Sequence, residues 1–417
     1  VYGHAAKTAH VDAVVHLGDY IYEYGKAVDP GSSEQTGRDF PEYTDKELLM
    51  LADYRKRYAL YRTDPQLQAL HAAHPFITVW DDHEIANDAY TYGAQNHNKG
   101  EGSFDARKAA ALAAYYEWMP VRPAEQGTSK RIYRSFSFGN LVELLMLDTR
   151  IAGREKQLSY NDYFDPDTGF DSKGFRDHIA SPDRRLLGQE QLLWVQQSIT
   201  TSDAVWQVLG QQVLMGKMNI PAGIIPYLGG RTPEVPHLVH KFARIKERVL
   251  RNDPSVTREE IISVNTVLPY NLDAWDGYPA EREAVLEVAY AADKNLVVLA
   301  GDTHNGWANN LKDAGGKQVG VEFATASVSS GGLETYLKLE SEQAEKFARD
   351  IEVLIDDLVY SNTKDRGYLI VSFTREKTEA RWIYVDTVKS REFRELVSSE
   401  KNLAVFVGKE NRKVVSQ

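Results

Sequence analysis

The sequence predicts a layered α/β fold. Several short and continuously apolar segments end abruptly at polar or acidic residues, which is typical of strands buried on both faces. Segments with helical patterning alternate with these strands, as in other α/β proteins. Passages rich in Gly, Asp, Pro and Ser are longer than ordinary connections, and we expect them to build or cover a site; they span residues 25–43, 152–183 and 219–236.

Three predicted strands lead directly into clusters of charged residues. In α/β proteins the carboxyl ends of the strands carry the loops where ligands gather, so we expect a site built from separate parts of the chain. The strands and their clusters are 11–17 before Gly18-Asp19-Tyr20, 75–80 before Asp81-Asp82-His83-Glu84, and 295–300 before Gly301-Asp302-Thr303-His304.

The remaining predicted elements complete the layers. Alternating apolar and polar residues predict an antiparallel hairpin at 368–373 and 381–385. Periodicity and length predict the other elements, in chain order, at 46–60 (helix), 105–118 (helix), 141–147 (strand), 187–199 (helix), 206–210 (strand), 280–292 (helix), 321–327 (strand) and 333–358 (helix).

Composition excludes several classes of protein. The chain has 417 residues, 42% hydrophobic and 26% charged, so it is neither disordered nor collagenous. Its formal net charge of −11 argues against a broad nucleic-acid-binding surface. It contains no cysteine, so any metal must be held by oxygen and imidazole ligands. No apolar run in the sequence approaches the roughly 18 residues of a membrane span.

Acidic residues are concentrated at the predicted carboxyl ends of the strands. Asp19, Asp82 and Asp302 would arrive there from three separate strands. Carboxylates a few Å apart repel one another strongly in a partly desolvated site, and multivalent cations relieve this repulsion. A carboxylate has two oxygens and can bridge two cations, which suits Asp19 directly after its strand. The alternative is that these acids only cap helices and form turns, which predicts no metal.

Six motifs occur in one order between residues 11 and 385. They are His16-Leu-Gly-Asp-Tyr-Ile-Tyr-Glu-Tyr24, Trp80-Asp-Asp-His-Glu-Ile-Ala-Asn87, Leu147-Asp-Thr-Arg150, Trp275-Asp-Gly-Tyr278, Gly301-Asp-Thr-His304 and Arg366-Gly-Tyr368. Together they resemble the PhoD-type alkaline phosphatases, within the calcineurin-like metallophosphoesterases. The first two motifs are long and specific, so chance similarity does not explain the match.

The resemblance implies a metallophosphoesterase sandwich of two mixed β-sheets flanked by α-helices, with long active-site loops. Residues 1–390 then form the catalytic domain and residues 391–417 a C-terminal extension. The family also has a small β-rich N-terminal domain and then a strand ending in Ser-Cys, whose thiolate is an iron ligand. Neither is in the sequence, which begins at Val1, and we expect the N-terminal part of the protein to be missing.

The resemblance further implies a centre of Fe(III) and Ca²⁺. Asn87 and the Asp81-Asp82 pair are both candidates to complete the calcium shell, and the sequence does not choose between them. If the cysteine ligand is absent from the whole protein, other divalent metals on oxygen ligands are the alternative. The implied metal ligands are Asp19 as the bridging aspartate, Tyr22 as an iron-bound phenolate, Asp82 at the second metal, and Asp302 as the late acidic ligand.

Three further residues are candidates for contact with substrate. The resemblance implies that His83 faces the phosphate and that His304 is a metal ligand or a phosphate contact. Arg150 follows a predicted strand, and its planar guanidinium suits phosphate oxygens. It is equally suited to neutralise one of the site acids, and both roles are open for it.

The function implied is metal-dependent hydrolysis of small-molecule phosphate esters to release inorganic phosphate, through a metal-activated water. A phosphodiesterase, including a phospholipase D-like activity, is the second enzymatic hypothesis. A non-catalytic metal-binding scaffold is the hypothesis from another class. Family members are commonly exported, so the resemblance implies an extracellular, periplasmic or cell-surface location.

Overall fold

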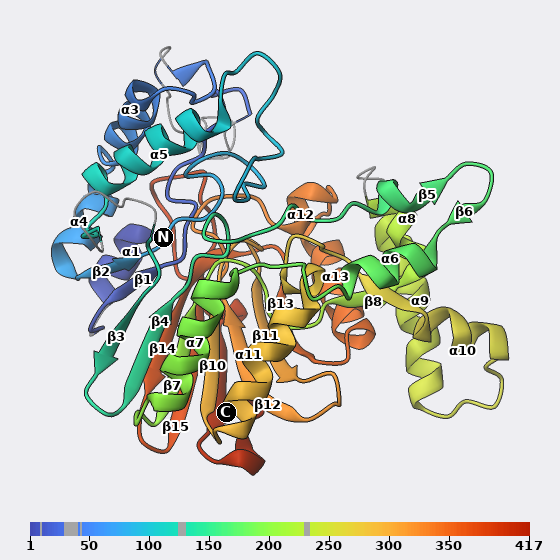
Figure 1. The fold of residues 1–417 in the computed structure, drawn as a ribbon. Coiled ribbons are helices and arrows are strands. Elements are labelled where there is room, and N and C mark those ends of the chain that lie inside the picture. The colour runs from blue at the N-terminus through green and yellow to red at the C-terminus, as the bar shows by residue number, and fades with distance from the viewer. Residues whose placement is uncertain (9–10, 29–40, 42–43, 124–130, 229–233) are drawn as a thin grey trace.

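The computed structural model describes residues 1–8, 11–28, 41, 44–123, 131–228 and 234–417. The predicted α/β fold class is confirmed: two large β-sheets pack face to face, and helices cover the outer face of the larger sheet (Figure 1). No helix among the described residues combines the length and the apolar character needed to span a membrane. Most of the long loop predicted at 25–43 lies outside the described residues.

The larger sheet has seven strands and is mixed. Four adjacent strands, β12, β10, β7 and β4, run parallel, and their burial explains why their sequences are largely apolar. The spatial order is β13 (Leu358–Asn362), β11 (Gly306–Lys312), β12 (Gln318–Ala324), β10 (Asn295–Ala300), β7 (Trp206–Gly210), β4 (Val142–Met146) and β3 (Arg134–Phe138).

The second large sheet has four strands and is wholly antiparallel. Its first two strands are the hairpin that the alternating sequence predicts. Residues 391–417 supply its last two strands, so they are part of this sheet. The order is β14 (Arg366–Phe373), β15 (Lys377–Val385), β16 (Lys401–Phe406) and β17 (Val415–Ser416).

Large aromatic side chains fill the space between the two sheets. Trp206, Phe323 and Trp382 are buried there in one hydrophobic cluster. The indole N–H of Trp382 also donates to the carbonyl of Ala324 at 2.9 Å, which fixes one sheet against the other. This core lies beneath the end of the sandwich at which β10 and β4 deliver their acidic loops.

A second cluster lies on the other face of the seven-stranded sheet, beneath helices. It includes Val195 of α7 (Gln189–Thr201), Val285 of α11 (Pro279–Ala291) and Ile351 of α13 (Ser341–Leu354). The single helix predicted at 333–358 is wrong. It is divided into α12 (Leu333–Tyr336) and α13, because Lys338 adopts a left-handed conformation (φ 55°) and Glu340 begins a new helix with a capping box.

A small parallel sheet and four helices carry the first two site loops. The sheet consists of β1 (Val14–His16) and β2 (Phe76–Thr78). Tyr54 of α3 donates its hydroxyl hydrogen to the carbonyl of Ile85 at 2.6 Å, and Arg107 of α5 donates to the hydroxyl of Tyr54. Helices α3 and α5 therefore support the loop after β2. The helices are α1 (Tyr2–Thr8), α3 (Leu51–Tyr61), α4 (Pro65–Ala73) and α5 (Phe104–Trp118).

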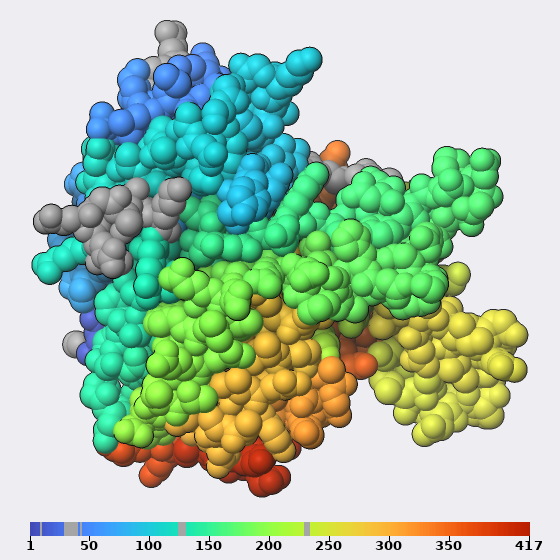
Figure 2. Space-filling view, in the orientation of Figure 1, coloured from blue at the N-terminus to red at the C-terminus, as the bar shows by residue number. Residues whose placement is uncertain are grey.

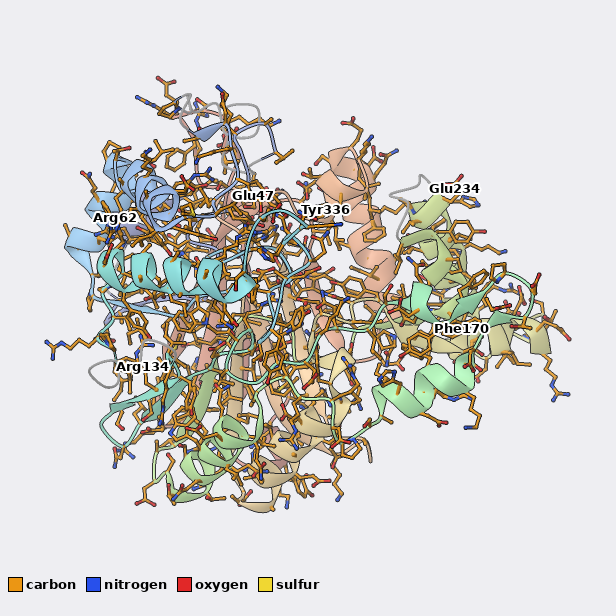
Figure 3. All side chains as sticks on the ribbon, turned by 45° about the horizontal axis from the view of Figure 1, so that its top comes forward. Glu47, Arg62, Arg134, Phe170, Glu234 and Tyr336 are labelled. Carbon is orange, nitrogen blue, oxygen red and sulfur yellow. The ribbon has the colours of Figure 1, made fainter. Side chains whose placement is uncertain are left out.

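A lobe projects from the sandwich beside α13 (Figure 2). Figure 3 shows the part that holds Phe170 and Glu234 standing apart from the part that holds Arg62 and Arg134. The predicted loops 152–183 and 219–236 contribute short elements to it. The lobe contains β5 (Phe164–Asp165), β6 (Gly169–Phe170), α6 (Ser172–Ile179), β8 (Asn219–Pro221), α8 (Ile225–Leu228), α9 (Glu234–Leu250), α10 (Arg258–Asn265) and β9 (Val267–Pro269).

Asp276 is a buried acid outside the strand-end loops, and it gives the fold a testable pH dependence. Its carboxylate accepts a hydrogen bond from the backbone N–H of Met218 at 2.7 Å. Burial raises its pKa from 3.8 to about 6, although Arg282 and Lys217 partly oppose this shift. The folded state therefore keeps a proton on Asp276 that the unfolded chain releases at lower pH, so stability is lost as the pH rises from about 4 to 6.

We predict that Asp276→Asn stabilises the protein at neutral pH and not in acid. The amide keeps an oxygen that can accept from Met218 but carries no buried charge. The gain in the free energy of unfolding should approach about 3 kcal/mol above pH 6 and vanish near pH 4. Thermal unfolding of both proteins at several pH values measures the difference. A difference that does not change with pH would contradict the assignment.

Candidate metal centre

The loops after β1 and β2 meet at a glycine. Gly18 has φ of 111°, and a Cβ at this position would lie 2.3 Å from the Cβ of Asp81. The buried carboxylate of Glu84 accepts hydrogen bonds from the backbone N–H of Asp19 at 3.0 Å and of Asp81 at 2.7 Å. Glu84 therefore ties the first acidic motif to the second, and only glycine at position 18 allows so close an approach.

Site residues from distant parts of the chain share an unusual backbone conformation. Asp19, Asp302 and His304 have φ values of 55°, 57° and 59°, and Asp88 has 53°. The left-handed conformation costs a non-glycine residue on the order of 1–3 kcal/mol, so the surrounding contacts must hold it in place. Such residues are concentrated at functional sites, and here four of them surround one cluster of acids.

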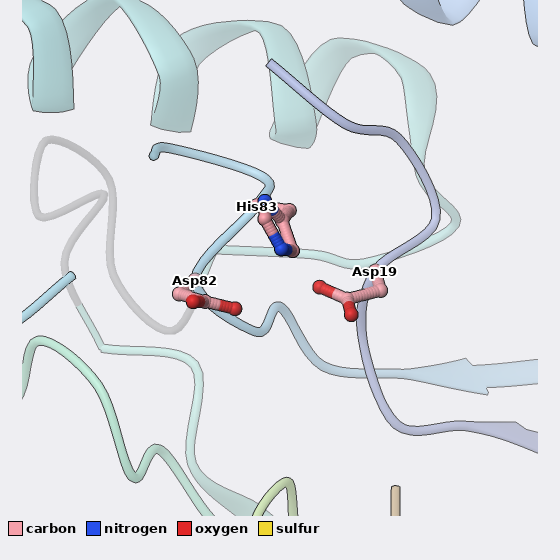
Figure 4. Close-up of side chains that lie close together, drawn as sticks. All are labelled: Asp19, Asp82 and His83. Atoms are coloured by element: carbon pink, nitrogen blue, oxygen red, sulfur yellow. The ribbon is translucent and has the colours of Figure 1, made fainter. Parts of the chain in front are cut away.

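The structure brings the predicted acids together in two overlapping groups. Asp19, Asp82 and His83 offer ligand atoms that all lie within 4.8 Å of one another, and so do Asp81, Asp82 and Asp302. Figure 4 shows the carboxylates of Asp19 and Asp82 and the ring of His83 directed toward one another from two loops. Asp82 belongs to both groups, so it is placed between two candidate cation positions.

Arg150 is the main positive charge among these acids. It is fully buried, and its guanidinium contacts Asp302 at 2.8 Å, Asp273 at 2.8 Å and Asp81 more closely still. Of the two roles that the sequence leaves open for Arg150, the structure shows the ion pairing with site acids. Asp273 also pairs with the buried Arg154.

The two arginines do not neutralise the acids. Burial, with repulsion from Asp273, raises the pKa of Asp302 to about 7 even though Arg150 opposes the shift. Burial, Asp273 and Asp82 likewise raise the pKa of Asp88 to about 7. The site therefore carries more negative charge than its own cations can balance, and additional positive charge would stabilise it.

Several buried carboxylate oxygens in this cluster have no hydrogen-bond partner in the part of the chain that the structure describes. Among the described residues, Asp19 Oδ1, Asp81 Oδ2 and Asp82 Oδ1 are buried and accept no hydrogen bond. Buried polar atoms are almost always satisfied, so three unsatisfied oxygens in one place require an explanation. Hard cations such as Ca²⁺ and Fe(III) bind carboxylate oxygens, and the donor set fits them.

Tyr22 and His304 lie at the edge of the same cluster. The Tyr22 hydroxyl donates to Asp19 Oδ2 at 3.2 Å, lies 3.1 Å from His304 Nε2, and accepts from the Ser330 hydroxyl at 2.8 Å. Burial and the charge of Asp19 raise the pKa of Tyr22 well above its usual value. The carbonyl of Gly331 lies 2.8 Å from His304 Nδ1 and can only accept, so Nδ1 carries a hydrogen and donates it, while Nε2 faces Tyr22.

Asn87 and Asp81 are placed differently. The amide of Asn87 donates to Gln95 at 3.0 Å, whereas the carboxylate of Asp81 lies in the cluster with Asp82 and Asp302. The structure thus brings Asp81 to the candidate cation positions, and Asn87 keeps an amide oxygen that this hydrogen bond does not use.

Sequence reasoning missed four acids that shape the site. Glu84 lies in the second motif and Asp88 directly follows it, so their nearness to Asp82 in the sequence is a signal that predicts both as site residues. Glu23 lies in the first motif, but the sequence assigns it no role there, and Asp273 precedes the Trp275 motif without following a strand. The partners of these last two acids, His83 and Arg150, are far away in the sequence, and only the folded chain brings them into contact.

Comparisons with known proteins agree with this geometry. The family model of the PhoD-like phosphatases matches residues 1–382. The chain belongs to the PhoD-like phosphatase family. It is 32% identical to alkaline phosphatase D of Bacillus subtilis (strain 168) over an alignment 403 residues long, and the match covers 92% of this chain and 59% of that protein. The chain therefore spans well under two thirds of the length of this curated relative.

A solved structure of PhoD is similar over all of this chain, with a TM-score of 0.70 and 30% sequence identity, and the match covers 68% of that structure's chain. The resemblance seen in the six motifs is thus confirmed at the level of family and fold. In this PhoD-like chain the first, second, third and fifth of these motifs supply the loops that meet around Asp82.

We predict that Gly18→Ala disrupts the junction between the first two motifs. The added methyl group must displace Asp81, and the left-handed backbone adds strain, so the free energy of unfolding should fall by about 2–5 kcal/mol. Gly100→Ala is the matched control, because Gly100 has a similar φ of 105° but no atom within 4 Å of its added Cβ. It should cost only about 1–2 kcal/mol. Equal losses in chemical denaturation would contradict the close approach.

Proposed function

We propose that this chain hydrolyses phosphate esters at the acidic cluster around Asp82. The observation that carries the proposal is the group of buried, unsatisfied carboxylate oxygens at Asp19, Asp81 and Asp82. Membership of the PhoD-like phosphatases and similarity to a protein named alkaline phosphatase D support this reading. Hydrolysis of an anionic substrate by an acidic site requires cations, and the acids are arranged to hold them.

The proposed centre has two cation positions that share Asp82, whereas the family resemblance implies Asp19 as the bridging residue. Asp19, His83 and the Tyr22 hydroxyl lie around the first, and Asp81 and Asp302 around the second. When bound, the cations supply positive charge that neutralises phosphate oxygens and lowers the pKa of a water molecule. We propose Fe(III) and Ca²⁺, because the ligand atoms of the cluster are carboxylate oxygens apart from the Tyr22 hydroxyl and one nitrogen of His83. Binding must remove the proton of Tyr22, which favours a trivalent ion.

The two histidines are placed to act on the substrate beside the cations. His304 Nε2 lies 3.7 Å from Asp19 Oδ2, and the His83 ring packs beside Tyr22 with its centroid 4.3 Å from that of the tyrosine. We propose that one of them stabilises charge on the phosphate and that the other donates a proton to the leaving oxygen. Arg150 balances the acids between the strand ends, and in this role it fixes Asp302 rather than the substrate.

The substrate is proposed to be a small phosphate monoester. Diester hydrolysis, including a phospholipase D-like activity, and metal binding without turnover are the alternative outcomes of the same test. We also propose that the protein acts outside the cytoplasm, at the cell surface, in the periplasm or in the medium, as the family resemblance implies.

We predict that Asp19→Ala lowers kcat for a chromogenic phosphate monoester by at least about 10²-fold, because it removes a ligand of the first cation position. Chelator should abolish the activity of the parent protein, and readdition of Ca²⁺ and iron should restore it. The control is Asp165→Ala, since Asp165 is exposed on the lobe.

Assays of the matching diester separate the two enzymatic hypotheses. Faster release from the diester would replace the monoester proposal by the phosphodiesterase. A folded chain that binds metal but hydrolyses neither ester would overturn the enzymatic proposal in favour of the scaffold.

A further inference from the structure

The imidazole of His83 is held on several sides by one short segment. Glu23 Oε2 lies 2.7 Å from His83 Nδ1. The rings of Tyr22 and Tyr24 flank the imidazole, with centroids 4.3 Å and 5.4 Å from its own. Three consecutive residues therefore determine where this ring lies, and the ring lies next to the carboxylates of Asp19 and Asp82.

The carboxylate of Glu23 is itself fixed. It is fully buried, and its second oxygen accepts from the backbone N–H of Asn87 at 2.7 Å and from the amide of Asn96 at 2.8 Å. The buried guanidinium of Arg57 donates to the carbonyl oxygens of Tyr22 and of Tyr24, the latter at 2.7 Å. These bonds hold the backbone on both sides of Glu23, so the carboxylate has no room to turn away from His83.

The hydrogen-bonding character of Glu23 then determines which nitrogen of His83 is used. Asn87 and Asn96 both donate to the Glu23 carboxylate. This is the pattern expected of an ionised carboxylate, because such a group can only accept hydrogen bonds. The nitrogen that it contacts, Nδ1, must carry a hydrogen, so Nε2 is the atom left to meet a cation or a phosphate oxygen. Without the acceptor, the ring could rotate or exchange its two nitrogens.

We propose that Glu23 is a positioning residue that fixes His83 with Nε2 directed at the cluster of Asp19 and Asp82. Its effect on turnover rests on the proposed function, whereas its effect on the imidazole does not. Tyr22 and Tyr24 limit the tilt of the ring, and Glu23 fixes its rotation and its tautomer. The segment thus supplies both a site hydroxyl, at Tyr22, and the support for a second site residue.

The first test observes the imidazole directly in the metal-free protein. Nuclear magnetic resonance of protein labelled with ¹⁵N at histidine should show a downfield, slowly exchanging Nδ1–H of His83, assigned by its loss in His83→Gln. Glu23→Ala removes the acceptor, and Glu23→Gln keeps its shape without its charge. In both variants the resonance should disappear or move upfield. In Asn96→Ala, which removes a donor to Glu23 but leaves the contact with His83, it should remain.

A resonance that is absent from the parent protein, or unchanged in both Glu23 variants, would overturn the proposal. Circular dichroism and thermal unfolding establish that each variant is folded, and Glu23→Gln keeps the test valid if Glu23→Ala is not.

The second test compares the kinetics of the metal-loaded protein. Glu23→Gln should lower kcat by about 10–100-fold while KM changes little, because the substrate is still bound but His83 is no longer held for reaction. Asn96→Ala should lower kcat less. A change in KM alone, or an unchanged kcat, would overturn the positioning role. If the parent protein hydrolyses no ester, the proposed function fails, and the histidine resonance still decides whether Glu23 positions His83.

Discussion

Repulsion among the aspartates that converge on Arg150 is the constraint on which the rest of the site depends. Asp81, Asp273 and Asp302 contact this single buried guanidinium, and Asp82 lies 3.7 Å from it. Arg154 also pairs with Asp273, but two positive charges cannot balance four carboxylates, so the protein must hold them by other means. It does so through backbone hydrogen bonds, left-handed residues and supporting helices, all of which keep the negative charges close together. A cluster held against its own repulsion is prepared to bind cations.

Two of the sheets, the large mixed sheet and the small parallel sheet, bring the acids of the cluster together. The parallel strands β10 and β4 bring Asp302 and Arg150 to one end of the large sheet, and the small parallel sheet brings the other two acidic loops to the same place. Glu84 joins these two loops through backbone N–H groups, while α3 and α5 support them from outside. The same segment that ends in Tyr24 then holds His83. Different residues of one connected network thus position the loops, balance part of the charge of the acids and orient the His83 ring.

Much of this arrangement follows from local sequence, and the exceptions have physical reasons. Strands such as β7 and β10 are predictable because burial on both faces requires continuous apolar residues, and Asp302 is predictable because it directly follows one. The break between α12 and α13 was missed because helical periodicity continues across Lys338, where the backbone changes direction. Asp273 and Glu23 were missed because their partners, Arg150 and His83, are far away in the sequence.

The most direct test of the central claim is the metal content of the purified chain and three variants, measured by mass spectrometry after loading with iron and calcium. If the acids form two cation positions that share Asp82, the parent chain holds two ions, Asp19→Ala and Asp302→Ala each hold one, and Asp82→Ala holds none. Full occupancy in Asp82→Ala, or no bound metal in the parent chain, would contradict the account.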